Sequence, residues 1–238
     1  MRALADVLDP KCLAVVTPLL EENRPGRVAA FDADGTLWRS DVGEELLRHL
    51  AAHRLLPHHA RDGVYEEYER ILERDPQAAY VRAVEYMEGL EETTLYQLCH
   101  ELFERRFLGR LFPFAQPLLA ALKEKQVEVV LVSASPRWIV EAGARVFGVP
   151  KENVIAFDAP VESGRISLPV REPLPVGEGK VAALKARGLT PDLGVGNGEL
   201  DEPMLAYSKR ALVIAPYDDP GNGLVQAARK RGWPVQRG

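Results

Sequence analysis

Five short runs of consecutive apolar residues constrain the fold of this chain more than any other feature. Each run ends at small or acidic residues, and helical patterns or loops separate the runs, which are 28–31, 127–132, 154–157, 193–195 and 211–214. This alternation is typical of an α/β fold with a mainly parallel sheet. Because the runs are apolar at successive positions, we expect strands that are buried on both faces. The sequence therefore predicts a doubly wound, mainly parallel sheet that helices cover on both sides.

The spacing of these runs is uneven, because residues 32–126 separate the first run from the second. This long segment shows helical patterns over 42–53, 61–74, 76–90 and 95–107. In the third pattern, Pro76 occupies the first helical position, where proline is favoured. We therefore predict an all-helical cap domain at residues 41–110, inserted into an α/β core domain that consists of residues 1–40 and 111–238.

Two further elements follow the insertion. The sequence predicts a helix over 117–125 that returns the chain to the sheet. Residues 162–166 indicate a hairpin turn in which Gly164 supplies a positive φ. The largest basic cluster, Arg229 to Arg231, is expected on the solvated face of a C-terminal helix.

Composition limits the class of protein. Apolar residues make up 46% and charged residues 27% of the 238 positions, which is ordinary for a soluble globular chain. No apolar run approaches the roughly 20 residues that span a bilayer, and the opening lacks a secretory signal, so we expect a cytoplasmic protein without a membrane partner. The net charge of −5 argues against broad nucleic-acid binding. Cys12 and Cys99 are too few for a disulfide framework and are expected to be reduced thiols.

Two carboxylates follow the first apolar run directly, in the segment Phe31-Asp32-Ala33-Asp34-Gly35-Thr36-Leu37. Because they are two residues apart at the end of a strand, both point into the crevice where open α/β sheets bind ligands. A carboxylate can accept a phosphoryl group, and a neighbouring acid can protonate the leaving alkoxide and later activate water. We assign Asp32 to the first role and Asp34 to the second. The alternative is an ordinary strand-ending turn rich in Asp and Gly.

The hexapeptide that begins at Asp32 resembles the first motif of the haloacid dehalogenase (HAD) superfamily. The second strand ends in Ser133-Ala134-Ser135-Pro136, which resembles the second motif of that family, an apolar strand closed by Ser or Thr. The resemblance implies that Ser133 binds a phosphate oxygen and that Gly35 and Ala134 contact the substrate. Taken alone, Ser133 would more often be a helix cap, but its position after the second strand favours the phosphate-binding role.

Two further motifs follow in the order of the family. Lys180 resembles the third motif, a lysine that opens a helix before the fourth strand, and its charge would stabilise the transferring group; Lys185 is the competing candidate. The segment from Gly194 to Met204 resembles the fourth, metal-binding motif, with Asn197 where many members have Asp and Asp201 at the second acidic position. The resemblance implies a Mg²⁺ ion held by Asp32, the backbone carbonyl of Asp34 and Asn197, with Asp201 in or just beyond this shell. An amide in place of a carboxylate should weaken the site.

The helical insertion matches the cap position of the phosphoserine phosphatase-like branch of the family. By its spacing from Asp32, Asp41 falls where phosphoserine phosphatases have a Glu that binds the substrate amino group, and the region also resembles phosphorylcholine phosphatases. Asp41 followed by Glu44 is equally a good capping pair for the first cap helix. An aromatic face for an ammonium group could come from Trp38, Tyr65, Tyr68, Tyr80 or Tyr86, and a carboxylate partner from Arg54, Arg61, Arg70, Arg74 or Arg82.

These motifs favour a magnesium-dependent hydrolase that acts through an aspartyl-phosphate on a small phosphorylated metabolite, such as phosphoserine or phosphocholine. A haloacid dehalogenase would not need the second acid that Asp34 provides. A phosphotransferase or mutase would keep the same motifs, and a non-catalytic protein that binds phosphate or a partner is the alternative from another class.

Overall fold

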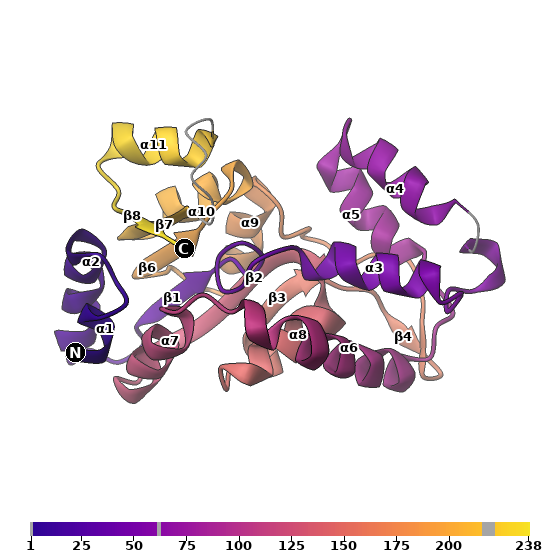
Figure 1. The fold of residues 1–238 in the computed structure, drawn as a ribbon, viewed down its shortest axis with the longest axis horizontal. Helices are drawn as coiled ribbons and strands as arrows, with labels where there is room; N and C mark the ends of the chain where they lie inside the picture. The colour runs from indigo at the N-terminus through magenta and orange to yellow at the C-terminus, as the bar shows by residue number, and fades with distance from the viewer. Residues whose placement is uncertain (1, 61–62, 216–221) are drawn as a thin grey trace.

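The computed structural model describes residues 2–60, 63–215 and 222–238, which form a six-stranded parallel sheet in the order β3-β2-β1-β6-β7-β8 (Figure 1). The strands are β1 (Val28–Phe31), β2 (Glu128–Pro136), β3 (Val154–Phe157), β6 (Leu193–Gly196), β7 (Ala211–Ala215) and β8 (Val235–Arg237). A separate antiparallel pair, β4 (Val161–Glu162) and β5 (Arg165–Ile166), forms the hairpin predicted around Gly164. The predicted α/β fold with a parallel sheet is therefore confirmed.

Side chains of each strand alternate between two apolar cores. In β1, Ala29 and Phe31 join one core, and Val28 and Ala30 join the other. The first core is covered by α1 (Arg2–Ala5), α2 (Pro10–Glu21), α7 (Ala115–Glu124) and α8 (Arg137–Val146). The second is covered by α9 (Glu178–Ala186), α10 (Glu202–Tyr207) and α11 (Gly223–Arg231), on the opposite side of the sheet (Figure 1). This arrangement explains why the strand residues are apolar at successive positions.

The segment between β1 and β2 is helical, as predicted. The elements that precede α7 in this segment are α3 (Val42–Ala52), η1 (His58–Ala60), α4 (Val64–Leu72), α5 (Pro76–Glu85), α6 (Glu92–Arg106) and η2 (Leu108–Arg110). Helix α5 ends five residues before the predicted position 90, because the chain turns at Gly89 (φ +84°) and the Gly89 N–H bonds the carbonyl of Ile166. Positions 61 and 62 of the predicted second cap helix lie outside the described residues. None of the described helices is long and apolar enough to cross a membrane.

The helical segment 41–110, for which a cap domain is predicted, joins the rest of the chain through two segments that lie side by side. The Arg39 N–H donates to the carbonyl of Arg110, and the Phe112 N–H donates to the carbonyl of Leu37. Helix α6 of the cap packs closely on α8 of the core, where a Cβ at Gly143 would lie 2.7 Å from both Trp38 and Phe103. Helix α5 also packs on β2 and β3, where the Tyr80 ring meets that of Phe157 at 5.9 Å between centroids, while α4 packs on α5.

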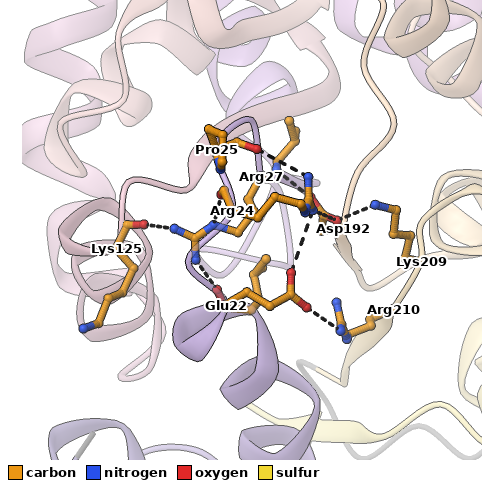
Figure 2. Close-up of polar contacts among 10 residues, drawn as sticks. Glu22, Arg24, Pro25, Arg27, Lys125, Asp192, Lys209 and Arg210 are labelled. Atoms are coloured by element: carbon orange, nitrogen blue, oxygen red, sulfur yellow. Dashed lines mark hydrogen bonds and ion pairs between the residues drawn. The ribbon is translucent and has the colours of Figure 1, made fainter.

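Asp192 lies at the end of the sheet where the strands begin, and it connects the amino ends of β1 and β6. Its carboxylate accepts hydrogen bonds from the Val28 N–H (3.0 Å), Arg24 (2.5 Å) and Lys209 (2.7 Å), the last two reaching it from two sides (Figure 2). Burial would raise the pKa of Asp192, but Lys209, the Val28 N–H and Arg24 outweigh it and lower the pKa below its ordinary value. The charged form of this buried carboxylate therefore stabilises the fold.

We expect Asp192→Asn to lower the free energy of unfolding by about 1 kcal/mol at neutral pH, because the negative charge is removed and one acceptor oxygen is replaced by an NH₂ donor, while the exposure of Arg24 and Lys209 limits the loss. Because the pKa of Asp192 is lower in the folded protein than its unfolded-state value of about 4, the carboxylate stabilises the fold at pH values above that unfolded-state pKa. This stabilisation is lost as the pH falls through the folded-state pKa. Urea unfolding at pH 7 and pH 3 checks this. A difference that persists unchanged at pH 3 would contradict it.

Candidate active site

The residues predicted to form the site come together at the carboxyl ends of three neighbouring strands. Asp32 follows β1 directly, Ser133 lies near the end of β2, and Asn197 follows β6. Strands β2, β1 and β6 are adjacent in the sheet, so these side chains converge at the carboxyl end of its strands. Lys180, in the first turn of α9, reaches the same point.

Lys180 is fully enclosed and holds two carboxylates together. Its Nζ donates to Asp32 Oδ1 (2.7 Å), to Asp201 Oδ1 (2.6 Å) and to the carbonyl of Val132 (2.8 Å). Burial alone would lower the pKa of Lys180, but Asp201 and Asp32 raise it above its usual value, so the side chain stays charged. The competing candidate, Lys185, is exposed on α9 and its ammonium lies over the Tyr207 ring, away from Asp32.

Asp32 is buried between this lysine and a threonine. Its Oδ1 accepts from Lys180, and its Oδ2 accepts from the Thr36 hydroxyl at 2.8 Å. Burial, followed by the charge of Asp201, raises the pKa of Asp32 to about 6, although Lys180 and Thr36 lower it. At neutral pH Asp32 is therefore mostly an ionised, poorly hydrated carboxylate, which suits a nucleophile.

Oxygen atoms gather beside Asp32 Oδ2. One end of the Asn197 amide lies 3.0 Å from this oxygen, 2.9 Å from the carbonyl oxygen of Asp34 and 3.0 Å from the Thr36 hydroxyl. With its nitrogen at this end, the amide donates to these oxygens; with its oxygen there, the site presents carboxylate, carbonyl and amide oxygens together. This second set consists of the ligands that hard cations such as Mg²⁺ prefer. The residues therefore fit the ion that the sequence implies.

Asp201 lies behind this oxygen group. Its Oδ2 accepts from the N–H groups of Asn197 and Gly198, both at 3.0 Å, and its Oδ1 accepts from Lys180. Both carboxylate oxygens thus order the loop and the lysine. Among the described residues, no group of three His, Cys, Asp or Glu side chains is arranged to hold a metal.

Gly35 makes room for Asn197. Its φ is +70°, a conformation that favours glycine, and a Cβ at this position would lie 2.3 Å from the Asn197 amide nitrogen. The turn after Asp34 and the close approach of the amide account for this glycine.

Asp34 accepts three hydrogen bonds. Its Oδ1 accepts from Trp38 Nε1 (2.7 Å) and from the Val42 N–H (2.8 Å), and its Oδ2 accepts from the Ser135 hydroxyl (2.7 Å). Burial, followed by the nearby charge of Asp41, raises the pKa of Asp34 well above its ordinary value against the opposing effect of these bonds. The raised pKa favours the protonated form of this carboxyl, as a general acid requires.

The second-motif residues lie where β2 meets this site. Ser133 is buried, and its Oγ accepts from the Ser135 N–H at 3.1 Å. Within the described residues, its own hydroxyl hydrogen has no acceptor. Ala134 is half-buried next to it.

Asp41 caps helix α3 and also lies near the acid. Its Oδ1 accepts from the Glu44 N–H at 2.7 Å, as the capping interpretation predicts. Its charge is also among the groups that raise the pKa values of Asp34, Tyr68 and Tyr80. Burial is the first cause of the raised pKa of Tyr80, which is about 12, with Asp41 second. The helix cap that the sequence predicted is therefore present, and the contact of Asp41 with a substrate stays a prediction.

The five aromatic candidates differ in their surroundings: the Tyr65 hydroxyl contacts Glu44 and Arg48, and Arg82 lies over the Tyr86 ring. The Trp38 ring is fully buried, and its centroid lies 5.0 Å from that of Phe103 and 6.3 Å from that of Phe147, so it does not offer a face to a substrate. Tyr68 on α4 and Tyr80 on α5 lie within the electrostatic reach of Asp41. Neither hydroxyl has a hydrogen-bond partner among the described residues.

The candidate arginines do not reach this region as free cations. Arg82 contacts Glu67 at 3.3 Å and Glu85 at 3.0 Å. The other three that the structure describes are exposed: Arg54, Arg70 and Arg74. Arg61 lies outside the described residues.

Sequence reasoning missed the contacts of Thr36, Trp38 and Ser135. Thr36 belongs to the same hexapeptide as Asp32, and Ser135 stands two residues after Ser133 on the same strand. The period of two along a strand would have indicated that Ser133 and Ser135 share a face. No sequence signal indicated that the Trp38 indole donates to Asp34.

Comparison with known proteins agrees with this architecture. The family model "haloacid dehalogenase-like hydrolase" matches residues 29–206, and no curated protein matches the chain. Among solved structures, a protein with unknown function from Bordetella pertussis Tohama I has a TM-score of 0.74 at 23% identity, covering 89% of this chain and 98% of that one. A conserved protein from Anaerococcus prevotii DSM 20548 has a TM-score of 0.70 at 16% identity (94% and 90% covered).

A further solved structure connects this fold to a named activity. The phosphoserine phosphatase of T. onnurineus, solved in complex with NDSB-201, has a TM-score of 0.53 at 20% identity, with 90% of each chain covered. At this identity the likeness concerns the fold. The family model spans most of the chain and includes all four motifs. The chain therefore belongs to the haloacid dehalogenase-like hydrolases.

Proposed function

We propose that this hydrolase is a magnesium-dependent phosphatase that cleaves small phosphomonoesters through an aspartyl-phosphate. The observation that carries the proposal is the contrast between two neighbouring carboxyls. Asp32 is bonded to a charged lysine, whereas Asp34 is held by three donors and has a strongly raised pKa. One is thus suited to attack and the other to carry a proton.

In this mechanism, the Asp32 carboxylate attacks phosphorus while the bond to the ester oxygen breaks. Asp34 gives its proton to that leaving oxygen, so the alcohol departs neutral. Asp34, now ionised, then takes a proton from a water molecule that attacks the phosphorus. Inorganic phosphate leaves and the Asp32 carboxylate is restored. Lys180 balances negative charge at Asp32 throughout, and Ser133 offers its free hydroxyl hydrogen to a phosphate oxygen.

Asp32 Oδ2, the Asp34 carbonyl and the Asn197 amide oxygen would hold Mg²⁺, which when bound neutralises charge on the phosphoryl oxygens. The chain's own contribution is to orient these oxygens: Thr36 bonds Asp32, and Asp201 fixes the backbone N–H groups at Asn197 and Gly198.

We expect Asn197→Asp to lower the magnesium concentration needed for half-maximal activity, since ligand charge contributes to hard-cation affinity. Activity titrated with MgCl₂ in wild type and variant measures this concentration. Asp192→Asn, an acid substitution at the far edge of the sheet, serves as the control and should leave it unchanged. An unaltered or higher requirement in Asn197→Asp would place this residue outside the metal shell.

We further propose that the substrate carries a positively charged group, such as an amine or choline. Asp41 is a half-buried carboxylate whose charge acts on Asp34, and it also acts on two tyrosines with unpartnered hydroxyls on α4 and α5. A cation between a carboxylate and aromatic rings gains both ionic and cation–π stabilisation. The candidate arginines that the structure describes are exposed or paired with acids.

Asp41→Asn tests this substrate class. Asn caps a helix about as well as Asp, so stability should change by only a few tenths of a kcal/mol. Selectivity for phosphocholine or phosphoserine over glycerol phosphate, measured as the ratio of kcat/KM values, should fall about tenfold or more. Thermal unfolding run alongside checks the cap. If the ratio does not move, Asp41 is a helix cap only.

A turnover assay with an aryl phosphate and magnesium separates hydrolysis from binding alone. A non-catalytic phosphate-binding protein would show no product. A phosphotransferase or mutase would release product faster when an alcohol acceptor is added, whereas a hydrolase would not.

A further inference from the structure

Ser135 lies at the point where the core strand β2 meets the first turn of cap helix α3. It is buried, and its hydroxyl donates to Asp34 Oδ2 at 2.7 Å. A Cβ at Gly43 would lie 2.7 Å from the Ser135 Oγ and 2.9 Å from Pro136. The absence of a side chain at Gly43 therefore lets α3 approach this hydroxyl directly.

The two oxygens of Asp34 have different partners. Oδ1 accepts from two N–H groups, those of the Trp38 indole and the Val42 backbone. An N–H can only donate, so these two bonds occupy Oδ1 and favour it as an unprotonated oxygen. Oδ2 has one partner among the described residues, the Ser135 hydroxyl, which can donate or accept. Oδ2 is therefore the oxygen left to exchange a proton with a substrate.

We propose that Ser135 is the positioning residue of the acid/base step, holding Asp34 Oδ2 toward the ester oxygen and turning its hydroxyl as the proton leaves and returns. When Oδ2 is ionised, Ser135 donates to it. When Oδ2 carries the proton, the hydroxyl hydrogen turns away and the Ser135 oxygen accepts from Oδ2, which holds the carboxyl in place until the ester oxygen takes the proton. The inference rests on the proposed phosphatase mechanism, since it assigns a task within that reaction.

Two esters with different leaving groups test it. An alkyl ester such as glycerol phosphate needs a proton on its leaving oxygen, whereas the stable phenolate of p-nitrophenyl phosphate can leave without one. We expect Ser135→Ala to lower kcat/KM for the alkyl ester at least about tenfold more than for the aryl ester, within the range of general acid catalysis. This ratio reports steps up to formation of the aspartyl-phosphate, so the later attack of water does not enter.

Three controls make the result specific. Ser135→Thr keeps the hydroxyl and should restore most of the alkyl-ester rate. Ser133→Ala removes a phosphate contact and should lower both esters alike. In an Asp34→Asn background, Ser135→Ala should not lower kcat/KM for the alkyl ester further, because the carboxylate that Ser135 positions is already absent. These comparisons use the ratio of two substrates in one preparation, so a partly unfolded variant does not mimic the effect.

If Ser135→Ala lowers kcat/KM equally for the two esters, the assignment of Ser135 is wrong. It is also wrong if Ser135→Ala lowers kcat/KM for the alkyl ester as much in the Asp34→Asn background as in wild type. If wild-type protein with magnesium hydrolyses neither ester, the proposed phosphatase function itself fails. The two failures are therefore distinguishable.

Discussion

Asp32→Asn is expected to reduce steady-state hydrolysis of every phosphomonoester by about 10⁴-fold or more, because an amide cannot form the aspartyl-phosphate. Asp34→Asn should cost less, on the order of 10² to 10⁴, since it removes only the acid/base contribution. Turnover of an aryl and an alkyl phosphate in both variants, measured with magnesium present, checks the order of these effects.

The fold should survive the loss of this carboxylate. Burial and the charge of Asp201 raise the pKa of Asp32 to about 6, so keeping this carboxyl ionised in the folded protein costs free energy relative to the unfolded chain, and a neutral amide of similar shape avoids this cost. Lys180 keeps Asp201 and the Val132 carbonyl as partners. We therefore expect a thermal midpoint close to that of wild type. Substantial turnover by a properly folded Asp32→Asn protein would exclude Asp32 as the nucleophile.

Most of the sheet could be predicted because strands buried on both faces leave uninterrupted apolar runs. Strand β8 could not: Val235–Arg237 contains one apolar residue, and it becomes a strand by pairing with β7. Helix α2 was also missed, since Pro18 lies inside it and interrupts the pattern that identifies helices. Strand β2 continues through Pro136 beyond the predicted end at 132, because the serines that close the apolar run remain extended.

The candidate site could likewise be predicted only in part. Parallel strands have their carboxyl ends at the same end of the sheet, so Asp32 and Asn197 could be assigned to a common site from topology alone. The Ser135–Asp34 bond joins residues 101 positions apart, and it depends on the close packing of α3 against β2. No local pattern encodes such a contact. The role of Asp41 could not be decided from the sequence either, since an Asp that caps a helix and an Asp that binds a substrate cannot be distinguished there.

Lys180→Met is expected to remove activity and to destabilise the fold, which distinguishes it from Asp32→Asn. Lys180 is 2% exposed and is the cation that both Asp32 and Asp201 contact. Breaking a buried ion pair by removing one partner costs about 3 to 5 kcal/mol, because uncompensated charge remains inside.

The pH dependence of this loss has a defined sign. Lys180 lowers the pKa of Asp32, so without it that pKa rises further above the unfolded-state value. A carboxyl with a raised folded-state pKa destabilises the protein as pH rises above its unfolded value and ceases to do so when protonated. Lys180→Met should therefore unfold at a temperature nearest to wild type at about pH 5 and fall progressively below it toward pH 8. Lys185→Met, an exposed change on the same helix, should match wild type in both stability and turnover. A Lys180→Met protein whose midpoint and rate track wild type at pH 8 would mean that the two carboxylates are neutralised by something other than this lysine.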